Sequence, residues 1–242
     1  MEGITAWAET DIGLRRRSNE DACRVDAGRG FFLVADGMGG AAAGEIASNL
    51  FAATAAELLP PVPPRTEAQA RALVKKVFAA ANEAILRHVA AHPDHAGMGC
   101  TAELLLLHPD GFVLGHIGDS RTYRFRQGRL QQLTRDHSLI QQQLDEGIIS
   151  ADEARSSRLR NVILRAVGVR SELAVDIISG PLLGGDLFLL CTDGFSDMVD
   201  EETMIAILAG ARPLSDKVSR CIAAARAAGG PDNITVALVE VG

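Results

Sequence analysis

The sequence predicts an α+β fold in which antiparallel sheets carry pairs of helices on their outer faces. Short apolar runs separated by turn signals, such as Pro109-Asp110-Gly111, favour antiparallel strands. Other segments have apolar residues at helical spacing. The elements follow one another as strands, a helix pair, strands, a second helix pair and a final strand. This order predicts helix pairs that cover the outer faces of the sheets.

The N-terminal part predicts two strands and then the first helix pair. Val74, Phe78 and Ile85 recur at helical spacing, which predicts one buried stripe on the second helix. Trp7 and Phe78 are expected in the core. The expected strands span residues 3–9 and 30–35, and the expected helices span residues 41–59 and 67–91.

The rest of the chain predicts a strand meander, a polar helical segment and the second helix pair. Ser150 and Glu153 match a capping box within the polar segment, and Ser138 is expected to cap a helix. The expected strands span residues 101–108, 112–117, 122–126, 174–179, 186–192 and 234–241, and the helices span residues 201–209 and 215–228. The first three of these strands are expected to form the meander.

Composition predicts one globular domain over residues 1–242. The net charge of −7 disfavours a nucleic-acid partner. The four cysteines are widely spaced, which predicts reduced thiols and a cytoplasmic location. An N-terminal signal peptide and a membrane span are not expected, because no sufficiently long apolar stretch occurs.

Carboxylates recur beside the predicted strands. Asp36, Asp119 and Asp193 follow apolar runs, and Asp232 precedes the last strand. A single Asp-Gly pair is usually only a turn. Several carboxylates at one sheet rim, however, would raise one another's pKa, and a divalent cation would relieve their repulsion. Oxygen-only ligands suit Mg²⁺ or Mn²⁺ rather than Zn²⁺.

Such a centre suits phosphoester hydrolysis. Two divalent ions polarise a phosphoryl oxygen and prepare a hydroxide for in-line attack. Gly37 is expected to leave room for the phosphoester beside the backbone. Arg16 lies four residues before the start of the carboxylate pair Glu20-Asp21. Its guanidinium would fit phosphate oxygens while these carboxylates would hold water around a metal.

The whole chain resembles a bacterial metal-dependent protein serine/threonine phosphatase of the PPM family, the phosphatase 2C type. Each motif is weak alone, but the ordered set is specific. The motifs are Arg16-x-x-Asn19-Glu20-Asp21, Asp36-Gly37-Met38-Gly39-Gly40, Gly99-Cys100-Thr101, Gly118-Asp119-Ser120-Arg121, Asp136-His137-Ser138, Asn161 to Gly168, Thr192-Asp193-Gly194 and Asp232-Asn233.

The resemblance implies a four-layer α-β-β-α sandwich with a small helical flap at about residues 139–168. It also implies roles for individual residues. Asp36 would bridge two tightly bound Mn²⁺ or Mg²⁺ ions, Gly37 would ligate one through its carbonyl, and Asp193 and Asp232 would complete the first ion's site. Glu20 and Asp21 would lie beside the metals, Arg16 would bind the substrate phosphate, and Asp119 would hold a third, weaker ion with Asp193. Thr192 and Asn233 would be supporting turn residues.

The implied activity is hydrolysis of phosphoserine and phosphothreonine in proteins by a metal-bridging hydroxide, in opposition to a serine/threonine kinase. A monomer is expected. Family members often have a histidine where this chain has Met38 or Ala41, so the general acid is not identified. Two alternatives are a silent module that binds phosphoproteins and a two-metal hydrolase of small phosphoesters or phosphodiesters.

Overall fold

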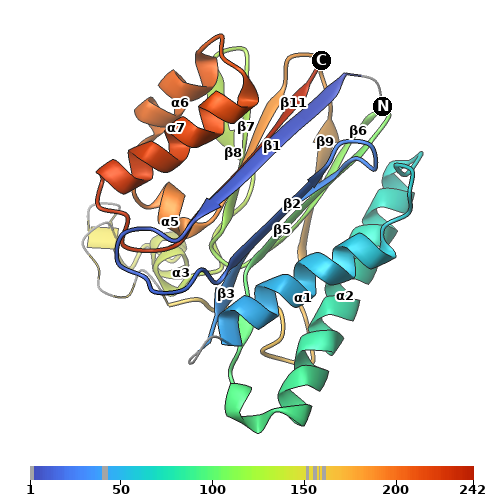
Figure 1. The fold of residues 1–242 in the computed structure, drawn as a ribbon, viewed down its shortest axis with the longest axis vertical. Helices are drawn as coiled ribbons and strands as arrows, with labels where there is room; N and C mark the ends of the chain where they lie inside the picture. The colour runs from blue at the N-terminus through green and yellow to red at the C-terminus, as the bar shows by residue number, and fades with distance from the viewer. Residues whose placement is uncertain (1–2, 40–42, 151–152, 155–156, 158, 160–161) are drawn as a thin grey trace.

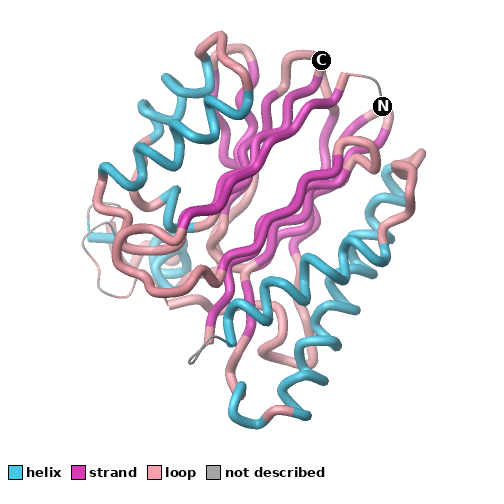
Figure 2. Tube along the Cα trace, viewed as in Figure 1, coloured by secondary structure: helices cyan, strands magenta, loops and turns pink. Residues whose placement is uncertain are grey.

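Two antiparallel β-sheets face each other across an apolar interior, and helices cover the outer face of each sheet (Figures 1 and 2). This computed structural model describes residues 3–39, 43–150, 153–154, 157, 159 and 162–242. The rings of Phe112 and Phe188 meet edge to face between the sheets, with centroids 5.1 Å apart. The arrangement confirms the predicted α+β sandwich.

One sheet, called the β1 sheet here, pairs the first and last strands of the chain. Its strands lie in the order β1 (Ile4–Asp11), β11 (Ile234–Val241), β10 (Leu187–Cys191), β7 (Arg121–Arg126) and β8 (Arg129–Gln132). Helices α6 (Glu201–Ala209) and α7 (Leu214–Ala227) cover it, and the short α5 (Asp193–Ser196) follows β10. Phe195, Met204 and Leu208 are among the side chains that fill this interface.

The other sheet, called the β2 sheet, packs under the first helix pair. Its strands lie in the order β2 (Asp21–Asp26), β3 (Phe31–Met38), β5 (Ala102–His108), β6 (Gly111–Ile117) and β9 (Asp176–Pro181), and β4 (Gly99–Cys100) pairs with the end of β3. The helices are α1 (Ala43–Leu58) and α2 (Glu67–Ala91), with a 3-10 turn at Pro93–His95. Phe51 and Phe78 meet at 5.0 Å between these layers.

Strong local signals are confirmed to the residue. Helices α2 and α6 and strand β11 have the predicted bounds. Thr66 caps α2 by accepting a hydrogen bond from the Gln69 amide at 3.3 Å. Phe78 is fully buried, as expected.

Two expectations are wrong, one about the strand meander and one about the burial of Trp7. The predicted meander breaks after β6, because β7 pairs with β10 in the β1 sheet. Gly118, at a φ of 106°, begins the turn by which the chain crosses between the sheets. Trp7 is 46% exposed, since β1 is an edge strand whose alternate residues face outward. Strands β2 and β8 were not predicted.

In the predicted flap, helix α3 spans Leu139–Asp145, and residues 153–154 are also helical. Ser138 caps it, as expected, by accepting from the Gln141 amide at 3.2 Å. The predicted capping box is also present: the Glu153 carboxylate accepts from the Ser150 amide at 2.8 Å, and Ser150 Oγ accepts from the Glu153 amide at 3.3 Å. The expected first helical residue, Ala41, and the motif residue Asn161 lie outside the described residues.

The four cysteines are free thiols, and Cys100, Cys191 and Cys221 are buried. Within the described ranges, no helix has the length and apolar character needed to cross a membrane.

Candidate metal centre

The predicted site residues gather at one rim of the two sheets. β2 begins at Asp21, beside the end of β3 at Asp36, and these two residues are partners in the strand register. Asp119 lies in the turn after β6, Asp193 follows β10, and Asp232 lies just before β11. Asp36 is close enough to the carboxylates of Asp21, Asp193, Asp119 and Asp232 for each of them to raise its pKa.

Asp21 is held by hydroxyl groups from the neighbouring sheet. Its Oδ2 accepts hydrogen bonds from Thr192 Oγ1 at 2.9 Å and Thr235 Oγ1 at 2.6 Å. Its Oδ1 is buried without a hydrogen-bond partner. Burial raises the pKa of Asp21 to about 7, although both threonines favour the ionised form. The fixed Oδ2 and the unpaired Oδ1 make Asp21 a carboxylate whose second oxygen is available to a cation.

Asp36 is fixed through its main chain. Its amide donates to Thr101 Oγ1 at 3.0 Å, and its carbonyl accepts from the Thr101 amide at 2.9 Å. Burial, followed by the charges of Asp21 and Asp193, raises the pKa of Asp36 well above its ordinary value. Neutral Asp36 is therefore favoured unless a cation offsets the neighbouring charges.

Gly37 is required by packing rather than by room for a phosphoester, which corrects the expectation from the sequence. A Cβ at Gly37 would lie 2.1 Å from the Gly44 carbonyl oxygen and 2.5 Å from that of Glu20. The Gly37 amide donates to the Glu20 carbonyl at 3.1 Å. The missing side chain thus lets α1 and the residue before β2 approach the end of β3.

Asp193 and Asp119 line one cavity of about 660 Å³, together with residues from α3 and α5. Asp193 begins α5, and its Oδ1 is buried without a hydrogen-bond partner. Burial and then the charge of Asp232 raise the pKa of Asp193 to about 6. Burial and then the charge of Asp193 raise the pKa of Asp119 as well. Both carboxylates therefore favour a nearby positive charge.

Arg16 lies beside these carboxylates on an exposed loop. Its Nη2 donates to Asp232 Oδ2 at 2.7 Å, and half of its side chain is exposed. Asn233 holds the loop, since its Nδ2 donates to the carbonyls of Ile12 at 3.0 Å and Ser18 at 2.9 Å. Arg16, Asp193 and Asp232 line a second cavity, which opens next to the first.

Glu20 ends the same loop. Asn233 Oδ1 accepts from its amide at 2.9 Å, and burial raises the pKa of its carboxyl group. The loop thus carries one cation and one carboxylate to the rim, as the Arg16 to Asp21 motif predicts.

The residues present fit divalent cations by their chemistry. The site offers carboxylate oxygens, and those of Asp21 and Asp193 include buried atoms without partners. Among the residues that the structure describes, no group of three or more His, Cys, Asp or Glu side chains is already arranged to hold a metal ion. The Arg16 to Asp232 ion pair occupies one of the carboxylates. Side-chain adjustment is therefore part of binding an ion here.

Sequence reasoning predicted Thr192 and Asn233 as supporting residues but gave no such role to Thr101 or Thr235. Thr101, between β4 and β5, and Thr235, in β11, reach Asp36 and Asp21 only because segments distant in the sequence come together in the sheets. Glu103 had a usable signal, because it is a charge within the apolar run Ala102 to Leu107. The Met38 side chain is half-buried at the end of β3, and Ala41 lies outside the described residues.

Comparison with known proteins identifies a protein family that matches most of the chain. Residues 15–229 match the family described as protein phosphatase 2C. The serine/threonine protein phosphatase PstP of Mycobacterium tuberculosis H37Rv is 39% identical over 234 residues, a match that covers 97% of this chain and 44% of that protein. The chain thus spans less than half the length of this relative. The serine/threonine phosphatase stp of Listeria monocytogenes EGD-e is 37% identical over 239 residues, covering 96% and 93% of the two chains.

Solved structures agree with this assignment. A crystal structure of the M. tuberculosis phosphatase PstP has a TM-score of 0.92 at 36% identity and covers 99% of each chain. The PstP catalytic domain in complex with two manganese ions has a TM-score of 0.90 at 37% identity, covering 99% of this chain and 98% of that one. With a family match over most of its length, this chain belongs to the protein phosphatase 2C family.

Proposed function

We propose that the protein is a metal-dependent serine/threonine phosphatase that removes phosphate from phosphoserine and phosphothreonine in proteins. The observation that carries the proposal is the set of carboxylates at one rim, with raised pKa values and buried oxygens that lack partners. Membership of the protein phosphatase 2C family supports it. So do relatives that are named serine/threonine phosphatases.

The ions are Mn²⁺ or Mg²⁺, two bound tightly and a third more weakly. When bound, they polarise the phosphoryl group and lower the pKa of water for in-line attack. Asp36, the Gly37 carbonyl, Asp193 and Asp232 would hold the tight pair, with Glu20 and Asp21 beside them, and Asp119 would hold the third ion with Asp193. The complex of the PstP catalytic domain with two manganese ions supports the choice of metal and the number of tightly bound ions.

Arg16 supplies the fixed positive charge for substrate. Its exposed guanidinium lines the cavity that contains Asp193 and Asp232. A planar guanidinium binds two phosphate oxygens at once, which orients the phosphoryl group and offsets its charge.

A histidine general acid is not assigned to this chain. His137 is buried, and burial lowers its pKa to about 4, so its imidazole is neutral at pH 7. It accepts a hydrogen bond from the Gly118 amide through Nδ1 and contacts Asp176 through Nε2. His137 is therefore a local structural residue, and we infer that the leaving-group proton comes from water.

Phosphate release from a phosphothreonine peptide tests the proposal, with Mn²⁺, Mg²⁺ or EDTA. Wild type should turn over only with metal, and Asp193→Asn should lower kcat/KM about 100-fold or more, because even outer-shell residues of metal sites cost 10–100-fold. Asp186→Asn is the matched control, since Asp186 is a buried carboxylate paired with Arg126 at the other end of β10. Metal binding without turnover would indicate a silent phosphoprotein-binding module. Faster turnover of a diester than of the peptide would indicate a different two-metal hydrolase.

We further propose that the protein acts as a cytoplasmic monomer that opposes a serine/threonine kinase. The free thiols support a reducing compartment. A phosphoprotein substrate set shared with a kinase follows from the proposed reaction. Reversal of kinase autophosphorylation in a purified mixture, together with the mass in solution, would test the partner and the monomer.

A further inference from the structure

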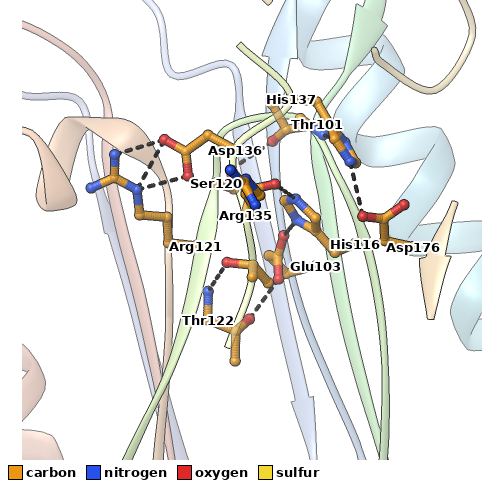
Figure 3. Close-up of polar contacts among 12 residues, drawn as sticks. Thr101, Glu103, His116, Ser120, Arg121, Thr122, Arg135, Asp136, His137 and Asp176 are labelled. Carbon is orange, nitrogen blue, oxygen red and sulfur yellow. Dashed lines mark hydrogen bonds and ion pairs between the residues drawn. The ribbon is translucent and has the colours of Figure 1, made fainter. Parts of the chain in front are cut away.

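A buried acid and a buried histidine face each other beside the candidate centre. Glu103 on β5 and His116 on β6 are register partners, and both side chains are fully buried. Figure 3 shows His116 Nδ1 directed at Glu103 Oε1, with which it forms a hydrogen-bonded ion pair. Thr122 Oγ1 donates to the other carboxylate oxygen of Glu103 at 2.6 Å. The proposed chemistry does not use this pair.

Both nitrogens of His116 act as donors. Its Nε2 donates to the Arg135 carbonyl at 2.9 Å. Burial lowers the pKa of His116, but the Glu103 carboxylate more than offsets this and raises it to about 9. The side chain is therefore a charged imidazolium at neutral pH, bonded on one side to a strand carboxylate and on the other to a main-chain carbonyl.

The Arg135 carbonyl belongs to the segment 133–138, which lies along the turn that carries Asp119. The His137 amide donates to the Gly118 carbonyl at 2.7 Å, and the Gly118 amide donates to His137 Nδ1 at 3.1 Å. On the other side of Asp119, Arg121 forms a bidentate pair with Asp136, with bonds of 2.9 and 2.7 Å (Figure 3). The segment thus holds the turn on both sides of Asp119.

The Asp119 carboxylate accepts a hydrogen bond from its own backbone amide, so its position depends on the main-chain conformation of this turn. Its side chain lines the cavity that it shares with Asp193. Thr101 adds a second support, since its hydroxyl bonds to Ser120 Oγ at 2.7 Å. The turn is therefore fixed from the segment 133–138 and from Thr101, which lies between β4 and β5.

We propose that Glu103 and His116 are positioning residues, which anchor the segment 133–138 through the Arg135 carbonyl and so set how tightly the Asp119 turn holds a divalent cation. The inference rests on the proposed function, which makes Asp119 a metal residue. A buried ion pair adds little stability over an apolar pair of similar volume. We therefore infer that Glu103 and His116 serve to fix the geometry of the segment rather than to stabilise the fold.

The test compares His116→Phe and Glu103→Gln with wild type in a calorimetric Mn²⁺ titration. The dissociation constant of the weakest Mn²⁺ site should rise about tenfold, the lower end of the 10–100-fold loss typical when a residue that supports a metal ligand is removed. The dissociation constants of the tighter Mn²⁺ sites should stay near those of wild type. Hydrogen exchange of the Gly118 amide, measured without metal, should be faster in both variants.

The matched control is again Asp186→Asn. Asp186 is fully buried and forms a bidentate pair with the partly exposed Arg126, so this variant also removes the charge of a buried, ion-paired carboxylate. It should lower stability without changing Mn²⁺ binding or Gly118 exchange. Equal effects of His116→Phe and Asp186→Asn would reduce the role of His116 to general stability and overturn the proposal.

A milder variant keeps the test decisive if His116→Phe does not fold. Thr122→Val removes one hydrogen bond to Glu103 and leaves the ion pair, so the weakest Mn²⁺ site should weaken in the same direction but less. Unchanged Mn²⁺ binding in this variant and in Glu103→Gln would refute the inference while wild type remained active. A wild type that neither binds Mn²⁺ nor releases phosphate would instead overturn the proposed function.

Discussion

The hydroxyl of Thr101 should contribute more to stability than its methyl group. Thr101 Oγ1 accepts from the Asp36 amide at 3.0 Å and bonds to Ser120 Oγ at 2.7 Å, and both Thr101 and Ser120 are fully buried. Thr101→Val keeps the shape and removes the hydroxyl. Two buried polar groups then lose a partner at about 1–3 kcal/mol each, so the free energy of unfolding should fall by about 2–6 kcal/mol.

Thr101→Ser is the control, because it keeps the hydroxyl and removes one methyl group. The lost methyl should cost about 1 kcal/mol. Urea unfolding, followed by circular dichroism, gives both values, provided that the transition is two-state. A Thr101→Val protein no less stable than Thr101→Ser would show that neither hydrogen bond matters and refute the reasoning.

Three further predictions concern pH, packing and metal. In EDTA, the free energy of unfolding should fall as the pH rises from about 4 to 7, because the folded-state pKa values of Asp193, about 6, and Asp21, about 7, exceed the ordinary 3.8. The folded protein therefore binds more protons than the unfolded chain in this window. Urea midpoints measured across the window should show the fall, and an unchanged dependence of the midpoint on pH in Asp193→Asn would contradict the prediction. Gly115→Ala should lower the free energy of unfolding by about 1–3 kcal/mol, since the new Cβ would lie 2.5 Å from Phe78 Cε2 and from Val74 Cγ1. Phe78→Leu should relieve part of this cost in a double-mutant cycle. Additive effects of the two substitutions on the free energy of unfolding would argue against the contact. Saturating Mn²⁺ should raise the melting temperature of wild type more than that of Asp193→Asn, and equal shifts would place the ions elsewhere.

Local sequence patterns predicted the parts of the fold that depend on residues close together in the chain. Helix α2 has an apolar stripe and the Thr66 cap, so its ends were predictable. Strand β2 was not predicted, because its charged and small residues give little apolar signal before it pairs with β3. No local pattern shows that the chain crosses to the other sheet after Gly118, because the partner of β7 is the distant strand β10.

The candidate site divides in the same way. Its carboxylates were predictable as strand-end residues of one chemical type. Thr192 and Asn233 were expected as supporting residues, but the role of Thr235 was not predictable, because Thr235 reaches Asp21 only after β11 has paired in the β1 sheet. The reason for Gly37 also needed the structure, since the Gly44 backbone that excludes a side chain belongs to a different element.

The pairing of β1 with β11 has a consequence for how the protein forms during synthesis. Ile4 lies opposite Val241, so β1 pairs with a strand that is far from it in the sequence and is synthesised much later. β1 must remain without its neighbour while the intervening chain leaves the ribosome, and contacts of such high sequence separation slow folding. The β2 sheet with α1 and α2 draws on earlier residues and is able to form first. The rim that gathers Asp193 and Asp232 is then completed only after β11 has been synthesised and has paired with β1.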